Sequence, residues 1–312
     1  MATSTPSASS PSEPSVDART GFGSRDLIRQ LTVTVSFILC IIGSVIGVGV
    51  FGGTRIAEAA GGALSADATF LAPASPAFSI WSVIYTGLGA YTIYQWLPSQ
   101  RSAPRQRSLG WLVAVSMLLN AAWILSVQAG SVPLSVAVIA ALLVTLAIVF
   151  KRYSRSRPDS WLGAIVVDGT LGLYLGWVCV AICANIASAL TAGGFDGFGL
   201  DPVLWAGIVL AAATAVGIGL AVYGRGRLAP AAALAWGLSW IAVSRVTGEL
   251  VSTATAVLAA VAAAVVVIAT VAARVAAHRR GENPGRGLEP VPRTGTPEGG
   301  RPGAPPPSRV GS

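Results

Sequence analysis

Aromatic and amide side chains recur at helical spacing in three apolar segments of the sequence. Side chains three, four or seven positions apart share one face of a helix. Tryptophan and tyrosine offer broad apolar faces with one polar hydrogen each, and an asparagine amide can both donate and accept hydrogen bonds. Such a set could line an apolar pocket for a planar ligand with polar edges. The candidate ligand-binding residues are Trp81, Tyr85, Asn120, Trp123, Tyr174, Trp177 and Asn185.

Each candidate also has a structural interpretation. Tryptophan and tyrosine collect at membrane–water interfaces as anchors, and the two asparagines can hydrogen-bond between helices. The two interpretations differ in whether loss of a side chain lowers ligand affinity or stability. Four tryptophans at the ends of apolar segments are assigned to the interface, namely Trp96, Trp111, Trp161 and Trp205.

Charged residues in or near apolar segments suggest further sites. Asp168 lies several residues inside one segment, where an acid is either functional or paired with a basic residue of the adjacent loop. Arg245 and Glu249 are four residues apart, a spacing that predicts an ion pair on a helix. Trp236 and Trp240 precede them at one-turn spacing, which leaves a second site open there.

The sequence carries no recognisable catalytic set. It has a single histidine, no paired carboxylates and no phosphate-binding loop. We therefore expect no enzymatic activity, no metal site and no required cofactor. The three cysteines lie in apolar segments, where they are expected to pack rather than to form disulfides or bind zinc: Cys40, Cys179 and Cys183.

The elements that position these residues follow from the composition. Of 312 residues, 53% are hydrophobic and 11% are charged, whereas about a quarter are charged in a soluble domain. The apolar blocks are long enough to cross a hydrocarbon core of about 30 Å, and without strand-like alternation they must be helices. The predicted fold class is an all-α integral membrane protein, a bundle of about eight transmembrane helices. The predicted spans are 31–52, 77–97, 109–128, 132–150, 161–190, 203–223, 228–244 and 250–274.

Basic residues divide the loops between these spans into two sets. One set, with both termini, holds sixteen of them, whereas the alternate loops hold only Arg55 and Arg245. Because basic loops stay in the cytoplasm, we predict a multi-pass protein of a bacterial cytoplasmic membrane with both termini cytoplasmic. No basic patch is interleaved with aromatic residues, so no nucleic-acid partner is expected. The sixteen are Arg19, Arg25, Arg29, Arg101, Arg105, Arg107, Lys151, Arg152, Arg155, Arg157, Arg225, Arg227, Arg274, Arg279, Arg280 and Arg286.

Three segments carry a resemblance to a known family. Residues 80–85 read Ile-Trp-Ser-Val-Ile-Tyr, residues 119–123 read Leu-Asn-Ala-Ala-Trp, and residues 174–185 read Tyr-Leu-Gly-Trp-Val-Cys-Val-Ala-Ile-Cys-Ala-Asn. In order and spacing they resemble the Val-Trp-x-x-Leu-Tyr, Leu-Asn-x-x-Trp and Tyr-Leu-x-Trp-Val-x-Phe-Ala-x-x-Leu-Asn segments of the TspO/MBR family. These are the tryptophan-rich sensory proteins related to the translocator protein. The chain resembles a divergent member, with Leu173 in place of the family's proline and Val180 in place of its phenylalanine.

The resemblance covers the first five spans and implies a division of the chain. Residues 31–190 would form a TspO-like five-helix bundle, with a pocket partly closed by the loop after the first helix, residues 53–76. Residues 191–276 would form an additional three-helix membrane segment. Disordered cytoplasmic tails are expected over residues 1–30 and 277–312, which are rich in Ser, Pro, Gly and Arg.

The same resemblance implies a function. The family binds porphyrins, haem-like tetrapyrroles or sterols and is linked to stress sensing or transport. We therefore expect a membrane sensor that binds or moves an apolar planar ligand such as a porphyrin or haem. Its partners would be the lipid bilayer and that small molecule, and a homodimer is left open. The alternative is a small-molecule transporter of another class, for which we see no clear repeat between the first and last four spans.

Overall fold

The computed structural model describes residues 23–47, 49, 58–156 and 158–281. Within these ranges the chain is helical and contains no strand. In chain order the elements are α1 (Ser24–Gly47), α2 (Ala59–Gly62), the 3-10 helix η1 (Ser75–Ser79), α3 (Ile80–Tyr94), α4 (Pro104–Gln128), α5 (Val132–Ser154), α6 (Trp161–Gly163), the π-helix η2 (Ala164–Gly169), α7 (Thr170–Ala192), the 3-10 helix η3 (Gly197–Gly199), α8 (Pro202–Tyr223), α9 (Leu228–Thr247) and α10 (Thr253–Arg279).

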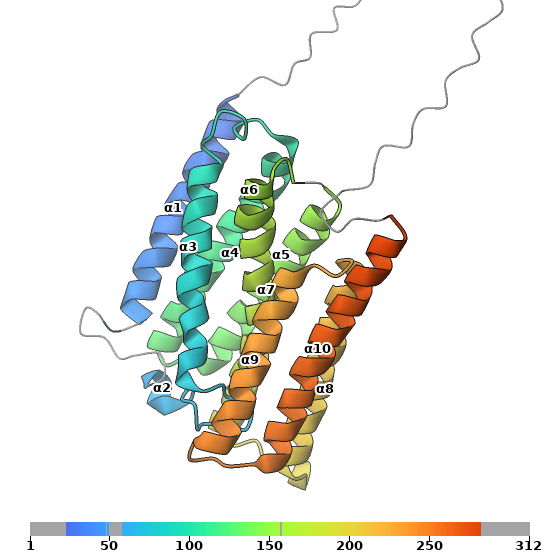
Figure 1. Cartoon of the computed structure of the whole chain (residues 1–312). Coiled ribbons are helices and arrows are strands. Elements are labelled where there is room, and N and C mark those ends of the chain that lie inside the picture. The colour runs from blue at the N-terminus through green and yellow to red at the C-terminus, as the bar shows by residue number, and fades with distance from the viewer. Residues whose placement is uncertain (1–22, 48, 50–57, 157, 282–312) are drawn as a thin grey trace, which may run out of the picture.

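Each of the eight predicted spans corresponds to a helix of the bundle in Figure 1. The stretch α6–η2–α7 is one continuous crossing of 32 residues. Six helices in the described ranges are long and apolar enough to cross a membrane, which confirms the prediction of an all-α membrane protein. The other two are α3, which has only 15 residues, and α9, whose tryptophans, serines and Arg245 lower its mean hydropathy.

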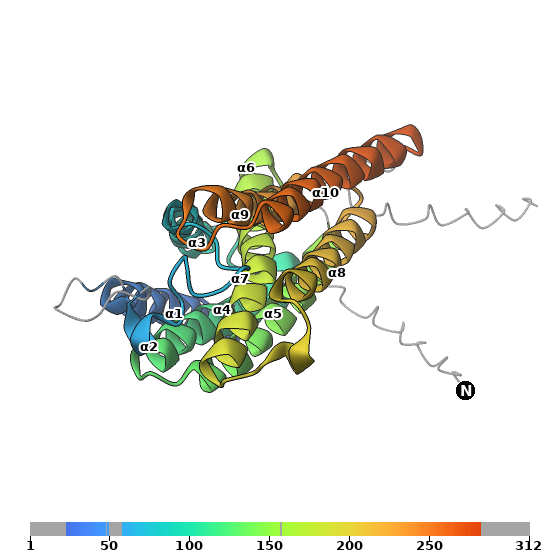
Figure 2. The same ribbon diagram turned by 90° about the horizontal axis from the view of Figure 1, so that it is seen from below.

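Helix α7 lies at the centre of the bundle. It packs against α3, α5, α8 and α9, and the view along the helices in Figure 2 shows it surrounded by them. Trp177 on α7 is only 1% exposed. Helices α1 and α4 pair on one side, and α8 and α10 pair on the other. Residues on α7 can therefore contribute to a site that several helices share.

Small residues allow α7 and α9 to approach closely. In lipid, helix association relies on van der Waals packing and interhelical hydrogen bonds, because lipid tails are as apolar as the side chains. A Cβ added to Gly176 would meet the backbone carbonyl of Pro230, and one added to Gly172 would meet Ala229 and Pro230. On the facing helix, a Cβ added to Gly237 of α9 would lie only 2.8 Å from the side chain of Val180 on α7. Helix α9 is thus closely packed against the predicted five-helix unit, and the predicted division at residue 190 stays a prediction.

Helix α1 begins earlier than predicted. The tail expected over residues 1–30 is helical from Ser24 onward. Asp26 is buried there and accepts from Arg107 of α4, with Nε to Oδ1 at 2.8 Å and Nη2 to Oδ2 at 2.5 Å. Arg29, one turn later, lies 3.3 Å from the same carboxylate. These ion pairs allow a polar first turn to be buried, which hydropathy alone does not indicate.

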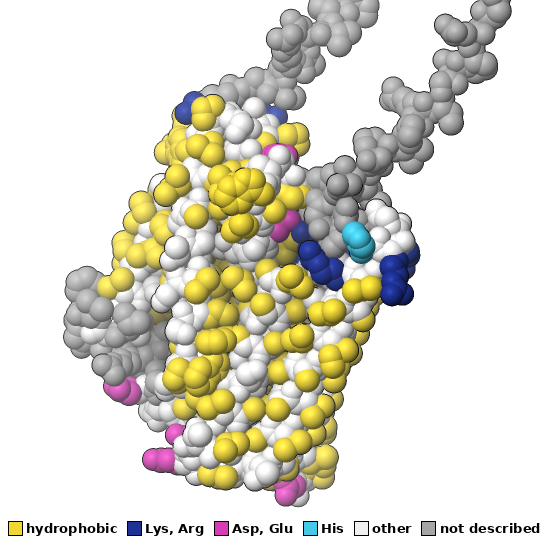
Figure 3. Space-filling model, viewed as in Figure 1, with side chains coloured by type: hydrophobic (Ala, Val, Ile, Leu, Met, Phe, Trp, Pro, Cys, Tyr) yellow, Lys and Arg dark blue, Asp and Glu magenta, His cyan; other side chains and the backbone are white. Residues whose placement is uncertain are grey.

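The two described chain ends lie at the same end of the bundle (Figure 1). On the face shown in Figure 3, hydrophobic side chains cover the flank and basic side chains lie near the end of α10, whereas acidic side chains are seen toward both ends. The position of the basic side chains agrees with the predicted division of basic residues between the loops. Most of both predicted tails, the start of the 53–76 loop, and Arg19, Arg55, Arg157 and Arg286 lie outside the described residues.

Candidate ligand pocket

The predicted aromatic and amide residues converge on one cavity. Its walls come from α3, α4, α5, α7, η1 and the segment before η1. Tyr85 and Tyr174 do not line the cavity and lie behind its wall. The predicted residues that do line it are Trp81, Asn120, Trp123, Trp177 and Asn185.

Trp81 is the centre of the aromatic wall. Its ring stacks on Tyr85 one turn later, with centroids 5.2 Å apart. It meets Tyr174 edge-on at 5.8 Å and Trp177 edge-on at 6.3 Å. Phe78 of η1 adds an edge contact to Trp177 at 5.6 Å. These offset and edge-to-face arrangements are the favourable ones for aromatic pairs, so α3 and α7 are joined by an aromatic cluster.

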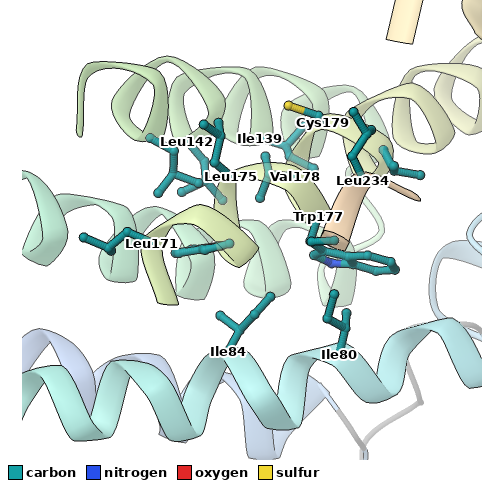
Figure 4. Packing of buried hydrophobic residues seen from close by; sticks show 14 of the residues in the cluster. Ile80, Ile84, Ile139, Leu142, Leu171, Leu175, Trp177, Val178, Cys179 and Leu234 are labelled. Atoms are coloured by element: carbon teal, nitrogen blue, oxygen red, sulfur yellow. The ribbon is translucent and has the colours of Figure 1, made fainter. Parts of the chain in front are cut away.

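The indole of Trp177 is buried, but its N–H group is not used. Figure 4 shows its ring next to the buried side chain of Ile80 on α3. Its Nε1 has no hydrogen-bond partner. A buried N–H without an acceptor costs about 1–3 kcal/mol. The pocket therefore contains a donor that a bound molecule could satisfy.

Asn120 contributes a second unused donor. Its Oδ1 accepts from the Tyr85 hydroxyl at 3.0 Å and from Sγ of Cys40 at 3.4 Å, which ties α4 to α3 and α1. Its Nδ2 is buried and has no partner. Cys40 was predicted to be a packing residue, and its contact with Asn120 could not be recognised from sequence spacing because the two residues are 80 positions apart.

Asn185, in contrast, has partners on both sides of its amide. Its Oδ1 accepts from Nε1 of Trp123 at 2.8 Å, and its Nδ2 donates to Oγ of Ser135 at 2.9 Å. Asn185 therefore fits the structural interpretation, in which the asparagine hydrogen-bonds between helices. Tyr174 is similar, since its hydroxyl donates to the carbonyl of Ser116 at 3.1 Å. Ser135 was not among the candidates, although a lone serine in the apolar run of α5 was a usable signal.

The cavity is small in this conformation. Its volume is about 40 Å³, which suits a few water molecules at most, whereas ligand pockets usually measure about 300–1,000 Å³. The aromatic rings occupy the space that a planar ligand would need. Binding of such a ligand therefore requires the rings or the segment covering the cavity to move.

Asp168 lies in a separate ion cluster toward the other end of α7. Its Oδ2 lies 2.6 Å from Nη1 of Arg227, and its Oδ1 accepts from Nη2 of Arg105. The guanidinium of Arg227 also lies 5.0 Å from the ring centre of Tyr153. The ion-pair interpretation of Asp168 is therefore confirmed. Its partners come from the start of α4 and the turn before α9 rather than from the adjacent loop, because those segments meet at this end of the bundle.

The predicted ion pair between Arg245 and Glu249 is wrong. Helix α9 ends at Thr247, so Glu249 does not continue the helix on which a spacing of four would bring the two together. Arg245 instead donates to the carbonyl of Ala66 at 2.7 Å and lies 3.9 Å from Oδ1 of Asp67. Both contacts are with the segment that covers the cavity.

No group of three or more His, Cys, Asp or Glu side chains capable of holding a metal occurs within the described part of the chain. The residues that line the cavity offer aromatic faces and hydrogen-bond donors.

Comparison with known proteins agrees with this arrangement. The model of the TSPO-like protein family matches residues 30–271. The match begins in α1 and continues into α10, so it extends beyond the five spans in which the motifs were recognised. No curated protein and no solved structure matches the chain. Since the family match covers well over half of the sequence, this multi-pass membrane protein belongs to the TSPO-like family.

Proposed function

We propose that the protein is a membrane sensor or carrier that binds an apolar planar molecule, of the tetrapyrrole type, in the pocket between α3, α4, α5 and α7. The observation that carries this proposal is the pair of buried donors in an apolar cavity, Nε1 of Trp177 and Nδ2 of Asn120. A ligand with acceptors on its edge would satisfy both and recover part of their desolvation cost.

The chemistry of the walls supports a flat aromatic ligand. The indoles of Trp81 and Trp177 present broad faces that can stack on a conjugated ring, and the surrounding side chains are apolar. The resemblance of the three motifs to the tryptophan-rich sensory proteins points in the same direction. The TSPO-like family is generally non-enzymatic, and we propose no catalytic role for this member.

We also propose that both termini face the cytoplasm of a bacterial cell and that the protein lies in its plasma membrane. The basic loops and both described chain ends share one end of the bundle, as the rule for basic loops requires.

Titration of the purified full-length protein tests the proposed ligand class. Protoporphyrin IX and haem are added to protein in detergent or nanodiscs, and binding is followed by the Soret band and by quenching of tryptophan fluorescence. Saturable binding with one site per chain supports the proposal. Absence of saturable binding by either compound, with uptake of another solute by reconstituted vesicles, would instead support the transporter alternative.

A further inference from the structure

Helix α9 holds the segment that covers the pocket. We call residues 58–79 the covering segment. It runs from α2 to η1, and its side chains Leu64, Ala72, Pro73 and Phe78 form part of the cavity wall. Apart from α2 and η1 it consists of turns, one of which is closed by the hydrogen bond from the amide of Ala72 to the carbonyl of Thr69 at 3.1 Å. Its position therefore depends on what it packs against.

The first attachment lies next to η1. Nε1 of Trp236 donates to the carbonyl of Ala77 at 2.9 Å, and the amide of Ala74 donates to the carbonyl of Trp240 at 3.2 Å. The two indoles lie one turn apart on α9, with ring centres 5.5 Å apart. The indole bond of Trp236 and the backbone bond of Trp240 together hold the part of the covering segment that carries Phe78 into the cavity.

The second attachment is Arg245. This side chain is fully buried, at 0% exposure. Its Nη2 and the hydroxyl of Ser244 both donate to the carbonyl of Ala66, at 2.7 and 3.2 Å. Asp67 then connects the segment to the turn after α9, because its Oδ1 accepts from the amide of Glu249 at 3.0 Å.

Only part of the Arg245 guanidinium is hydrogen-bonded. Its Nε and Nη1 have no partner, and its nearest carboxylate, Asp67, is 3.9 Å away and 36% exposed. Removing an arginine charge from water is costly unless the charge is well paired. An apolar side chain would fill this position with less loss, so the arginine is explained by the polar contact that it makes with the covering segment.

We propose that Arg245 is a positioning residue for the pocket, and that α9 acts as a latch on the covering segment whose release admits the ligand. The identity of the ligand rests on the proposed function. The attachment of the covering segment to α9 does not depend on it. Under the latch proposal, α9 regulates a pocket whose walls come from α3, α4, α5, α7 and the covering segment.

The first test needs no ligand. Hydrogen exchange is measured by mass spectrometry on full-length protein in nanodiscs, for the wild type, Arg245→Gln and Trp236→Phe. Each variant removes a hydrogen bond between α9 and the covering segment. A loss of about 1.4 kcal/mol in the free energy of opening corresponds to roughly tenfold faster amide exchange. We expect that increase in peptides covering residues 63–79, and above all at Ala74, with no change in peptides from α5.

Arg227→Gln is the matched control. It removes a partly buried arginine–carboxylate contact at the opposite end of α9, so it perturbs the same helix without contact with the covering segment. We expect its 63–79 exchange to equal that of the wild type. If Arg245→Gln does not fold, Trp236→Phe and Ser244→Ala carry the test, since each removes one attachment. Unchanged exchange of residues 63–79 in the folded latch variants would overturn the proposal.

The second test uses protoporphyrin IX in stopped-flow fluorescence. Release of a latch speeds both entry and exit, so association and dissociation rate constants should both rise severalfold while the dissociation constant changes less. A structural role alone would lower the melting temperature and leave both rates unchanged. If the wild type does not bind the porphyrin, the proposed ligand class fails, whereas the exchange experiment still decides whether the latch exists.

Discussion

Asn120 and Asn185 are the same residue type in one pocket, but their amide groups have different partners. Asn185 uses both its oxygen and its nitrogen in bonds to neighbouring helices, whereas the nitrogen of Asn120 has no partner. The two tryptophans Trp123 and Trp177 differ in the same way, since only the first donates its N–H. Each pair thus contrasts a group that bonds a neighbouring helix with a buried group that has no partner, which a ligand would satisfy under the proposed function.

Trp177→Phe should therefore weaken binding more than it weakens the fold. The substitution removes part of the aromatic face and a donor that has no acceptor in the closed pocket. We expect affinity for protoporphyrin IX to fall by about 1–3 kcal/mol, roughly five- to a hundredfold, with a small change in melting temperature. Fluorescence titration and thermal unfolding on the same preparation measure both quantities.

Trp123→Phe is the counterpart, because its N–H donates to Asn185 at 2.8 Å. Its melting temperature should fall, and because its ring also lines the cavity, porphyrin affinity should fall as well, but less than in Trp177→Phe. If Trp177→Phe and a parallel Trp81→Phe bind porphyrin at the wild-type level and melt at lower temperature, these aromatic residues are packing elements, and their assignment to the pocket is wrong.

At the scale of the elements, the bundle depends on two kinds of contact that a membrane helix can use, close packing of small residues and buried ion pairs. The interface between α7 and α9 uses the first, through Gly172, Gly176 and Gly237. The end of the bundle near η2 uses the second, where Asp168 joins α4 to the start of α9.

Gly176→Ala should destabilise the protein. The added methyl group would collide with the carbonyl of Pro230, which is backbone and cannot rotate away. Overpacking of this kind costs about 1–3 kcal/mol. Gly219→Ala on α8 is the control, because no atom lies within 4 Å of the added Cβ. Thermal unfolding in detergent should show a lower melting temperature for the first variant only, and equal melting of the two would contradict the close α7–α9 packing.

Asp168→Asn should be more harmful still. It leaves the buried Arg105 and the partly buried Arg227 without their carboxylate, and breaking a buried ion pair costs about 3–5 kcal/mol. Asp196→Asn, in an exposed turn before η3, is the control for the same chemical change. We expect a large loss of thermal stability or of folded yield for the first and none for the second. A stable Asp168→Asn variant would argue that the ion cluster is not required for assembly.

At the scale of the whole molecule, some features follow from sequence and others do not. Hydropathy and basic loops predict the eight helices and their two ends, because these depend on local composition. The motifs predict which residues of α3, α4 and α7 converge, because side-chain spacing on one helix is regular. The partners of Trp236 and Arg245 could not be predicted, since they lie 159 and 179 residues away in the chain. The π-helix at Asp168 likewise has no local signature.

Topology can be measured directly. A reporter fused after residue 280 should report the cytoplasm, and one fused after residue 196 should report the opposite side. The reason is that sixteen basic residues lie in the tails and loops assigned to the cytoplasm, whereas the alternate loops hold only Arg55 and Arg245. A cytoplasmic signal at residue 196 would reverse the proposed orientation.

The covering segment follows α1, at the end of the bundle opposite the two chain ends (Figure 1). A solute that reaches the pocket past this segment therefore arrives from the side of the membrane away from the termini. The ion cluster of Asp168 with Arg105 and Arg227 lies toward the other end of the bundle. Under the proposed function, a ligand that enters past the covering segment reports what is present on that one side of the membrane. Transfer across the membrane would in addition require a path past this ion cluster, so Asp168 would then have to part from its arginines.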